Sequence, residues 1–175
     1  MKGKNLTICL YGNPILRKKT TSIKKIDYQL KKIIADLKET MMQQDGLGLA
    51  ANQIDASVSI FCYNPHGVGI EQEPVAIINP EIIKSEGKEE REEACLSLPG
   101  IVEVLMRPAR VVIKGISEDG KKIETTASGL LARVFQHEID HLNGLFFTDR
   151  LSATRQKMLK KQLDQIAASS KKTKE

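Results

Sequence analysis

Two histidines four residues apart, His137 and His141, stand with Glu138 in the segment QHEIDH. In a helix with 3.6 residues per turn, positions four apart lie about 40° apart around the axis, so both imidazoles can reach one ion. Glu138 falls on the flank of the same face. Helices with this HExxH pattern bind a divalent metal through the histidines and use the glutamate as a general acid and base. The alternative is a pair of surface histidines that make ordinary hydrogen bonds.

The residues around this motif favour burial of the helix. Its apolar residues are Leu130, Leu131, Val134, Phe135 and Leu142. Two histidines and a glutamate buried there without partners would destabilise the fold, because buried polar groups lose their hydration. The pattern therefore predicts a metal site rather than surface histidines.

A catalytic metal needs a third protein ligand and an open position for water. HExxH proteases usually take that ligand from further along the chain, but no histidine follows His141 and the only later glutamate is Glu175. Upstream, Cys95 lies in a polar-flanked segment, EACLS, that leads into a predicted strand. A thiolate and two imidazoles leave the fourth tetrahedral position free. The other cysteines, Cys9 and Cys62, lie in apolar, strand-like runs that are typical of core thiols.

A glycine-rich segment, GLGLAANQ at residues 46–53, follows a predicted helix. A dinucleotide-binding loop would instead follow a strand and open a helix, so we reject that function. Gly46 and Gly48 suit the close approach of an extended peptide to the backbone. Gln53 can direct its amide at a substrate, or it can simply cap the end of the segment.

The elements that must position these residues form an α+β pattern in a single domain. Apolar residues at helical spacing predict helices over residues 27–44, 130–142 and 154–167. Apolar runs predict strands over residues 58–63, 75–78, 101–105, 110–116 and 122–126. We expect antiparallel or mixed β-sheets packed around the central metal-binding helix, with a further helix at the C-terminus.

Turn residues and charged segments set the boundaries. Asn143-Gly144 closes the second helix. Asn79-Pro80 stops the predicted strand over residues 75–78. The charged segment 84–93 suits an exposed strand or loop, and residues 169–175 are expected to fray. The predicted division is a catalytic domain over residues 1–167 and a basic, disordered tail over residues 168–175.

The 175-residue chain has the composition of a globular protein, with 41% hydrophobic and 28% charged residues, which excludes wholesale disorder. The apolar stretch near the N-terminus is too short for a signal peptide, and no run approaches the roughly 18 apolar residues of a membrane span. Three widely separated cysteines suggest no disulfide framework. We therefore expect a protein of the reducing cytoplasm that has no membrane contact.

The net charge of +5 is concentrated at the C-terminal end. Residues 150–175 hold eight basic and two acidic residues, a net of +6, whereas residues 1–149 hold 19 basic and 20 acidic residues, a net of −1. A basic end can contact phosphates, although a solvated helix is the plainer interpretation. We expect no sequence-specific binding to nucleic acid.

Three motifs in this order resemble those of the peptide deformylase family: GLGLAANQ at residues 46–53, EACLS at 93–97 and QHEIDH at 136–141. The resemblance extends over roughly residues 10–165 and is to the bacterial form that ends in a helix. It implies a metal-dependent hydrolase that removes the formyl group from the N-terminal formyl-methionine of new polypeptides and releases formate. It also implies one divalent ion on Cys95, His137 and His141. Fe(II) is then the native metal, and zinc, nickel or cobalt are other ions that these ligands accept.

The resemblance implies catalytic roles for three residues. Glu138 takes a proton from the attacking water and passes it to the leaving amine, while the metal lowers the pKa of that water. The Gln53 side-chain amide and the Leu96 N–H hold the oxyanion. One such donor contributes on the order of 3 kcal/mol to catalysis.

Other residues are expected to bind the substrate. Gly46, Leu47 and Gly48 border an extended peptide. Leu130 and Val134 lie one turn apart on the metal helix, where they either line a slot for the methionine side chain or simply pack in the core.

Glu93 is also expected close to the substrate, and its predicted ion pair with Arg107, which the family pattern suggests, braces the segment that holds the thiolate. Asp140 points away from the second histidine around the helix, which favours a structural role. Two positions depart from the family pattern, because Ala94 and Asp55 stand where the family usually has glycine. Ala94 is harmless only if its φ is negative, and Asp55 can alter the following turn.

Two other functions compete with this one. A zinc endopeptidase is disfavoured because the downstream ligand is missing. A non-catalytic ribosome-binding or RNA-binding protein is disfavoured because structural zinc sites normally have four protein ligands. The partners implied by the resemblance are formyl-methionyl nascent peptides and the ribosome, whose rRNA phosphates would attract the basic C-terminal helix.

Overall fold

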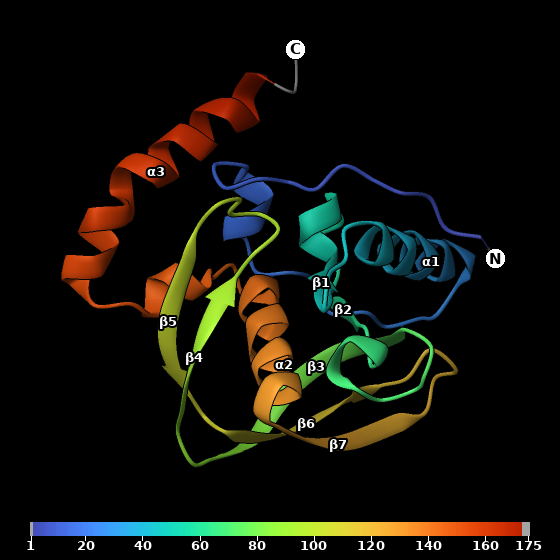
Figure 1. The fold of residues 1–175 in the computed structure, drawn as a ribbon. Coiled ribbons are helices and arrows are strands. Elements are labelled where there is room, and N and C mark those ends of the chain that lie inside the picture. The colour runs from blue at the N-terminus through green and yellow to red at the C-terminus, as the bar shows by residue number, and fades with distance from the viewer. Residues whose placement is uncertain (1, 173–175) are drawn as a thin grey trace.

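The computed structural model describes residues 2–172, which form helices and two antiparallel sheets (Figure 1). The helices are α1 (Tyr28–Gln43), α2 (Gly129–Leu142) and α3 (Ala153–Lys172). The strands are β1 (Gly48–Ala50), β2 (Ile60–Tyr63), β3 (Val75–Glu86), β4 (Glu89–Ala94), β5 (Val102–Arg107), β6 (Arg110–Ile116) and β7 (Lys122–Ser128). The predicted α+β class is therefore confirmed.

The two sheets lie on different sides of α2. The larger sheet has the strand order β1-β2-β3-β6-β7, and β4 pairs with β5 in a separate two-stranded sheet. Every pair of named neighbouring strands is antiparallel. Figure 1 shows α2 running between the two sheets, as the sequence predicts for the metal-binding helix.

The apolar side of α2 packs on the larger sheet. Phe135 of α2 meets the rings of Phe61 and Tyr63 on β2, with centroids 5.5 and 5.0 Å apart. A second cluster joins α1 to β1, β2 and β3, where Cys62 is fully buried as a core thiol. Cys9 differs from the prediction, because it is half-buried in an extended segment outside any strand.

The strand predicted to stop at Asn79-Pro80 continues to Glu86. The strand passes this point through an irregularity, because its register with β6 shifts between Ile78 and Glu81 and Asn79 has a left-handed φ of 49°. A bulge of this kind tolerates a proline, which lacks an N–H for the ladder. The Asn79 side chain holds the bulge by two hydrogen bonds of 2.8 Å to the backbone of Ile23. Asn79-Pro80 therefore marks a bulge within β3 and not the end of the strand.

The charged segment 84–93 agrees with the prediction of an exposed strand or loop. It divides between the end of β3 and β4, which turn at Gly87 with a φ of 68°, and most of its side chains are exposed. The glycine-rich segment, expected as a loop, forms the short edge strand β1 and the 3₁₀ helix η2 (Ala51–Ile54). This difference arises because pairing with β2 overrides the low strand preference of glycine.

The C-terminal helix is longer than predicted. α3 continues to Lys172, so residues 169–172, which were expected to fray, are helical, and residues 173–175 lie outside the described part of the chain. Its buried residues Leu159 and Ile166 close a third cluster that also contains Leu16, Phe146 and Phe147. The predicted domain boundary at residue 167 stays a prediction.

The end of α2 has the predicted glycine cap. Gly144 has a φ of 77°, and its N–H donates to the carbonyl of His141 at 2.9 Å. The N–H of Leu145 donates to the carbonyl of Asp140 at 2.9 Å, which completes a Schellman motif. A Cβ at Gly144 would lie 2.6 Å from the carbonyl oxygen of Arg17. This position therefore needs glycine both for its dihedral angle and for space.

We expect Gly144→Ala to lower the free energy of unfolding more than Gly69→Ala. Gly69 has a similar φ of 84°, but no atom of residues 2–172 lies within 4 Å of its Cβ position, so it tests the dihedral cost alone. That cost is about 1–2 kcal/mol, and Gly144→Ala adds the clash with Arg17. Urea denaturation of both variants measures the difference, and equal losses would contradict the close approach.

Candidate metal centre and substrate pocket

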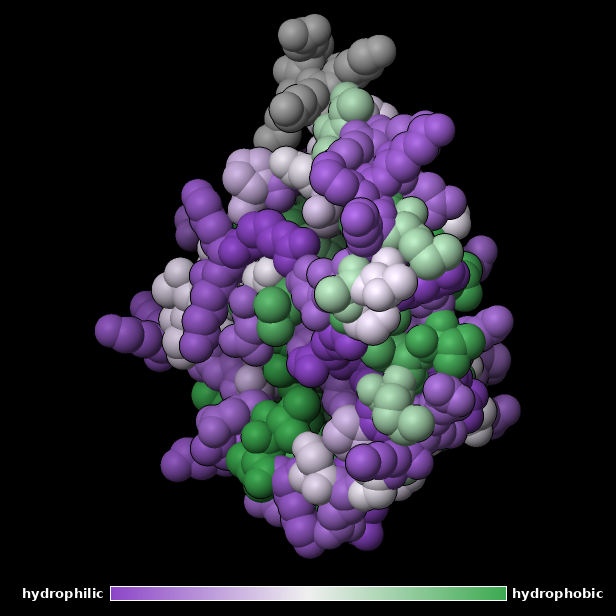
Figure 2. Space-filling model, turned by 90° about the vertical axis from the view of Figure 1, so that its left-hand side faces the viewer, coloured by the Kyte–Doolittle hydropathy of each residue, from purple (hydrophilic) through white to green (hydrophobic). Residues whose placement is uncertain are grey.

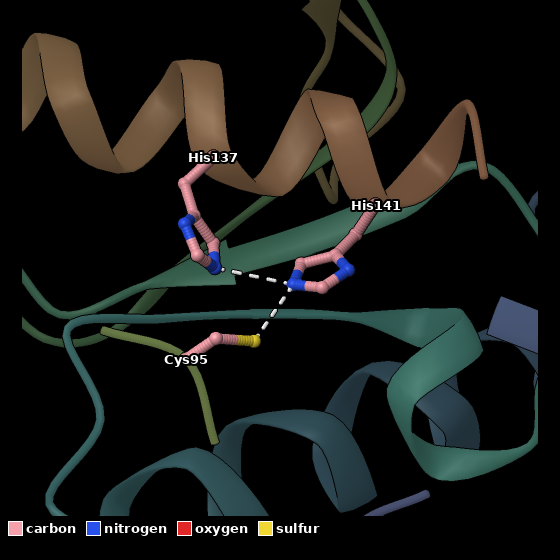
Figure 3. A group of neighbouring side chains, drawn as sticks. All are labelled: Cys95, His137 and His141. Atoms are coloured by element: carbon pink, nitrogen blue, oxygen red, sulfur yellow. Dashed lines mark hydrogen bonds between the residues drawn. The ribbon is translucent and has the colours of Figure 1, made fainter. Parts of the chain in front are cut away.

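Three ligand atoms converge between β4 and α2. Cys95 directly follows β4, and its Sγ lies 3.1 Å from Nε2 of His141. The Nε2 atoms of His141 and His137 are also 3.1 Å apart (Figure 3). The three donor atoms all lie within 4.8 Å of one another. The residues predicted from separate motifs are thus brought together into one site.

Glu93 fixes the ring of His137. Its Oε1 lies 2.7 Å from Nδ1 of His137, which places the ring proton on Nδ1 and leaves the Nε2 lone pair directed at the other ligands. Burial alone would raise the pKa of Glu93, but hydrogen bonds from His137 and Arg107 outweigh burial and hold that pKa well below its usual range. The Glu93 carboxylate is therefore negatively charged and accepts a hydrogen bond from Nδ1–H of His137.

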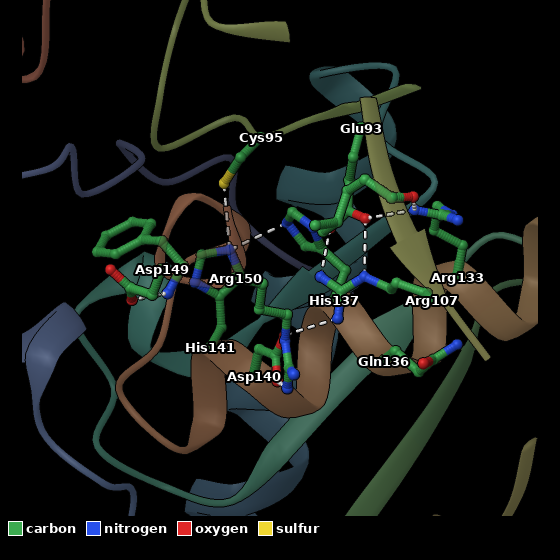
Figure 4. Close-up of polar contacts among 12 residues, drawn as sticks. Glu93, Cys95, Arg107, Arg133, Gln136, His137, Asp140, His141, Asp149 and Arg150 are labelled. Atoms are coloured by element: carbon green, nitrogen blue, oxygen red, sulfur yellow. Dashed lines mark hydrogen bonds and ion pairs between the residues drawn. The ribbon is translucent and has the colours of Figure 1, made fainter. Parts of the chain in front are cut away.

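Two arginines neutralise this buried carboxylate. Arg107 donates through Nε and a terminal nitrogen at 2.8 and 2.5 Å, which confirms the predicted ion pair, and Arg133 donates at 3.1 Å (Figure 4). Arg107 also donates to Asp140 at 2.8 Å, and Arg150 donates twice to the same carboxylate, at 2.6 and 2.5 Å. Asp140 thus connects Arg107 and Arg150, which agrees with a structural role and not with that of a metal ligand.

Glu138 lies buried beside the ligands. Its Oε2 has no hydrogen-bond partner among the described residues. Burial raises the pKa of Glu138 to about 7, which suits a group that takes and returns a proton near neutral pH. A Cβ at Gly48 would lie 2.5 Å from Oε1 of Glu138, so only glycine lets the carboxylate occupy this position.

Gln53 is held at both ends of its amide. Its Oε1 accepts a hydrogen bond from the N–H of Ala50 at 2.9 Å, which is the predicted capping contact. Its Nε2 donates to Oγ of Ser97 at 3.0 Å and lies 3.8 Å from Sγ of Cys95. The N–H of Leu96 has no hydrogen-bond partner within residues 2–172. Two donors therefore stand next to the thiolate.

A pocket of about 350 Å³ opens in front of these groups. Its lining contains every predicted site residue except His141: Gly46, Leu47, Gly48, Gln53, Glu93, Cys95, Leu96, Leu130, Val134, His137 and Glu138. Val134 also belongs to the core cluster under α2, so it both packs and lines the pocket. Glu93 borders the pocket, but its carboxylate is occupied by the arginines and His137.

The two departures from the family pattern have different consequences. Ala94 is not among the residues with positive φ, so its side chain causes no strain. Asp55 has a φ of 65° and adopts the left-handed conformation, which aspartate tolerates better than most residues do. The turn after the first motif therefore keeps a glycine-like backbone.

Sequence reasoning missed three polar residues of the site. Ser97 and Asn52 lie inside the quoted motifs, and Arg133 lies on α2, one turn before His137. Arg133 contacts Glu93, Ser97 contacts Gln53, and Asn52 donates to the carbonyl of His141 at 2.6 Å. Their only signal was polarity within an apolar pattern, which does not identify a partner.

The donor set fits a divalent ion. Two imidazoles and a thiolate are ligands of zinc and of other first-row metals. The lone pair of His137 Nε2 is directed inward, and the second carboxylate oxygen of Glu138 is buried without a partner among the described residues. Buried groups of this kind are stabilised when they face a cation.

Comparison with known proteins supports this assignment. The sequence pattern of the polypeptide deformylase family matches residues 5–157. A peptide deformylase of Syntrophobacter fumaroxidans is 45% identical over 147 residues, which cover 84% of this chain and 86% of that protein. The crystal structure of a peptide deformylase from Legionella pneumophila matches with a TM-score of 0.84 and 38% sequence identity. The match covers 91% of this chain and 94% of that chain.

A plant peptide deformylase has a TM-score of 0.89 at 32% identity, with 99% of this chain and 95% of that chain covered. The matched residues include all three motifs and the convergent ligands. The chain therefore belongs to the polypeptide deformylase family, the metal-dependent hydrolases that remove the N-formyl group from nascent peptides.

Proposed function

We propose that Cys95, His137 and His141 hold one divalent ion, which is Fe(II) in the native protein. Zinc, nickel or cobalt can take its place, because imidazole and thiolate ligands accept all of these ions. When bound, the ion supplies Lewis-acid activation of a water molecule beside the formyl carbonyl. A thiolate ligand next to iron is open to oxidation, so we expect the native protein to lose activity in air.

Glu138 moves the proton in this proposal. Its carboxylate takes a proton from the attacking water and delivers it to the nitrogen of the leaving amine, so that formate and a free N-terminus result. The buried carboxylate with its pKa near 7 supports this role. A nearby cation would lower that pKa and keep the base charged.

Gln53 and Leu96 stabilise the oxyanion. The Gln53 amide is oriented by Ala50 and Ser97, so its Nε2 donor stays beside Cys95 without reorganisation. The N–H of Leu96, the residue after Cys95, has no hydrogen-bond partner within residues 2–172, which supports its role as the second donor. Donors that are already in place contribute most to lowering the barrier, because nothing must move as charge develops.

The peptide substrate lies along β1. This strand pairs with β2 on one side and stands at the edge of the larger sheet, so its other side can pair with an extended peptide. Gly46, Leu47 and Gly48 border that side of the pocket, and Leu130 and Val134 line the part that receives the methionine side chain.

We expect Glu138→Gln to lower kcat for formate release from a formyl-methionyl peptide by about 10²–10⁴-fold, because the proton carrier is lost. Metal content should stay at one ion per chain, since the ligands are unchanged. Cys95→Ala should lose the metal as well as the activity. Formate release and metal content are both measured on protein purified without oxygen.

Glu90→Gln serves as the matched control, because Glu90 is exposed on β4. Absence of formate release from fully metal-loaded native protein would contradict the proposed function. Cleavage of an internal peptide bond in the same assay would favour an endopeptidase instead.

Gly48→Ala tests the close contact with Glu138. The new Cβ would lie 2.5 Å from Oε1, so the carboxylate must move, and we expect kcat to fall by about 10²-fold, as for a misplacement of roughly 1 Å. Gly46→Ala is the control for kcat alone. Gly46 also borders the peptide, so its KM can change, but its Cβ would meet no atom of residues 2–172 closer than 3.3 Å and Glu138 need not move. Equal kcat values of the two variants would show that the contact does not position Glu138.

We further propose that α3 binds the ribosome, where the substrate emerges, and that the protein works in the cytoplasm. Figure 2 shows the face that carries α3, on which hydrophilic residues predominate. Arg155 pairs with Glu103 and Lys160 with Asp164, whereas Lys157 has no ion-pair partner in the described part of the chain, and the same is true of Lys161. No helix among residues 2–172 is long and apolar enough to cross a membrane.

We expect Lys157→Glu with Lys161→Glu to lower ribosome affinity and to flatten its dependence on salt, because fewer cations meet phosphates. Turnover of a small formyl-peptide should not change. Co-sedimentation with ribosomes at several salt concentrations measures the effect. The double variant Lys24→Glu with Lys25→Glu changes the charge equally elsewhere, and an equal loss in that control would reject a specific role for α3.

A further inference from the structure

Asn52 connects the glycine-rich motif to the metal helix. Its side chain is fully buried in η2, immediately before Gln53. Its Nδ2 donates to the main-chain oxygen of His141, 2.6 Å away and 89 residues later in the chain. This contact therefore reaches the backbone of a metal ligand from the segment that carries an oxyanion donor.

The two histidine ligands are supported in different ways. His137 has the Glu93 carboxylate on its Nδ1. The Nδ1 of His141 is buried and has no partner among the described residues. Its ring is instead held by packing, edge-on to Phe146 at 5.4 Å and to His137 at 4.8 Å between centroids. Metal-binding histidines usually rely on a hydrogen bond to the second ring nitrogen for their orientation.

The position of the His141 ring therefore depends more on its backbone than the position of the His137 ring does. Its carbonyl oxygen accepts from the N–H of Gly144 at 2.9 Å and from Asn52. The first bond belongs to the helix cap. The second ties the last turn of α2 to η2, and so sets the distance between the ligand and the Gln53 amide.

The Oδ1 of Asn52 is buried without a partner among residues 2–172. A buried acceptor of this kind costs free energy. Packing alone would therefore be satisfied at least as well by an apolar residue of similar volume. A role in packing and a role in positioning consequently predict opposite effects for such a substitution.

We propose that Asn52 is a positioning residue for His141, as Glu93 is for His137, and that it holds His141 and Gln53 in one arrangement. The proposal rests on the proposed function, in which His141 holds the ion and Gln53 stabilises the oxyanion of the formyl group. Asn52 itself does not touch the substrate or the metal.

Asn52→Val and Asn52→Thr test this as a matched pair, because the two side chains have the same shape and differ in one hydroxyl that can donate to the His141 carbonyl. We expect Asn52→Val to weaken metal affinity by about 10- to 100-fold, as is typical when a ligand loses its outer partner. Its kcat should fall while KM stays near the native value. Asn52→Thr should retain most of both properties.

Metal affinity is measured by competition of Zn(II) or Co(II) between the full-length protein and a chelator. The absorption spectrum of the Co(II)-loaded protein reports the ligand geometry, and we expect it to shift in Asn52→Val alone. Native affinity and spectrum in Asn52→Val, or equal losses in both variants, would overturn the proposal. Urea unfolding with excess chelator separates stability from metal binding. Asn52→Ala replaces Asn52→Val if the latter does not fold.

The metal-binding measurements give a result whether or not the protein releases formate. Metal affinity and the Co(II) spectrum do not require any reaction. If native protein binds the metal and releases no formate, the proposed function fails, whereas the comparison of the two Asn52 variants still decides whether Asn52 positions His141.

Discussion

The site depends on the pairing of the buried Glu93 carboxylate with two arginines and a histidine. The carboxylate accepts hydrogen bonds from Arg107, Arg133 and His137 at 2.5–3.1 Å, and so attaches the β4–β5 hairpin to α2. Cys95 follows two residues later, so the same contact places the thiolate opposite the histidines. Loss of one partner from such a buried pair costs about 3–5 kcal/mol, because the other charges stay buried without compensation.

The position of α2 follows from the need to satisfy two unlike surfaces. Its apolar side, with Phe135, packs on the larger sheet, whereas Arg133 and Gln136 donate to main-chain oxygens at or beside the hairpin. The metal ligands lie where these surfaces meet, and the pocket opens there. Glu138 is consequently buried but adjacent to the pocket, and this burial raises its pKa toward neutrality.

Tertiary pairing changed several local expectations. Asn79-Pro80 has the composition of a strand end, yet β3 passes through it because β6 pairs on both sides of the irregularity and Ile23 holds the Asn79 amide. The glycine-rich motif became an edge strand because Gly48 pairs with Tyr63. Neither partner is close enough in the chain to be recognised from local spacing.

The sequence by itself determined the metal helix, its glycine cap and the His137–His141 pair, because helical periodicity and capping are local properties. Elimination among the cysteines then indicated Cys95, although no spacing connects it to His137, 42 residues later. Only the tertiary structure decided which nitrogen of His137 faces the other ligands and that Asn52 reaches His141. Those contacts depend on the packing of separate segments, and a polar residue's type does not name the partner it will meet.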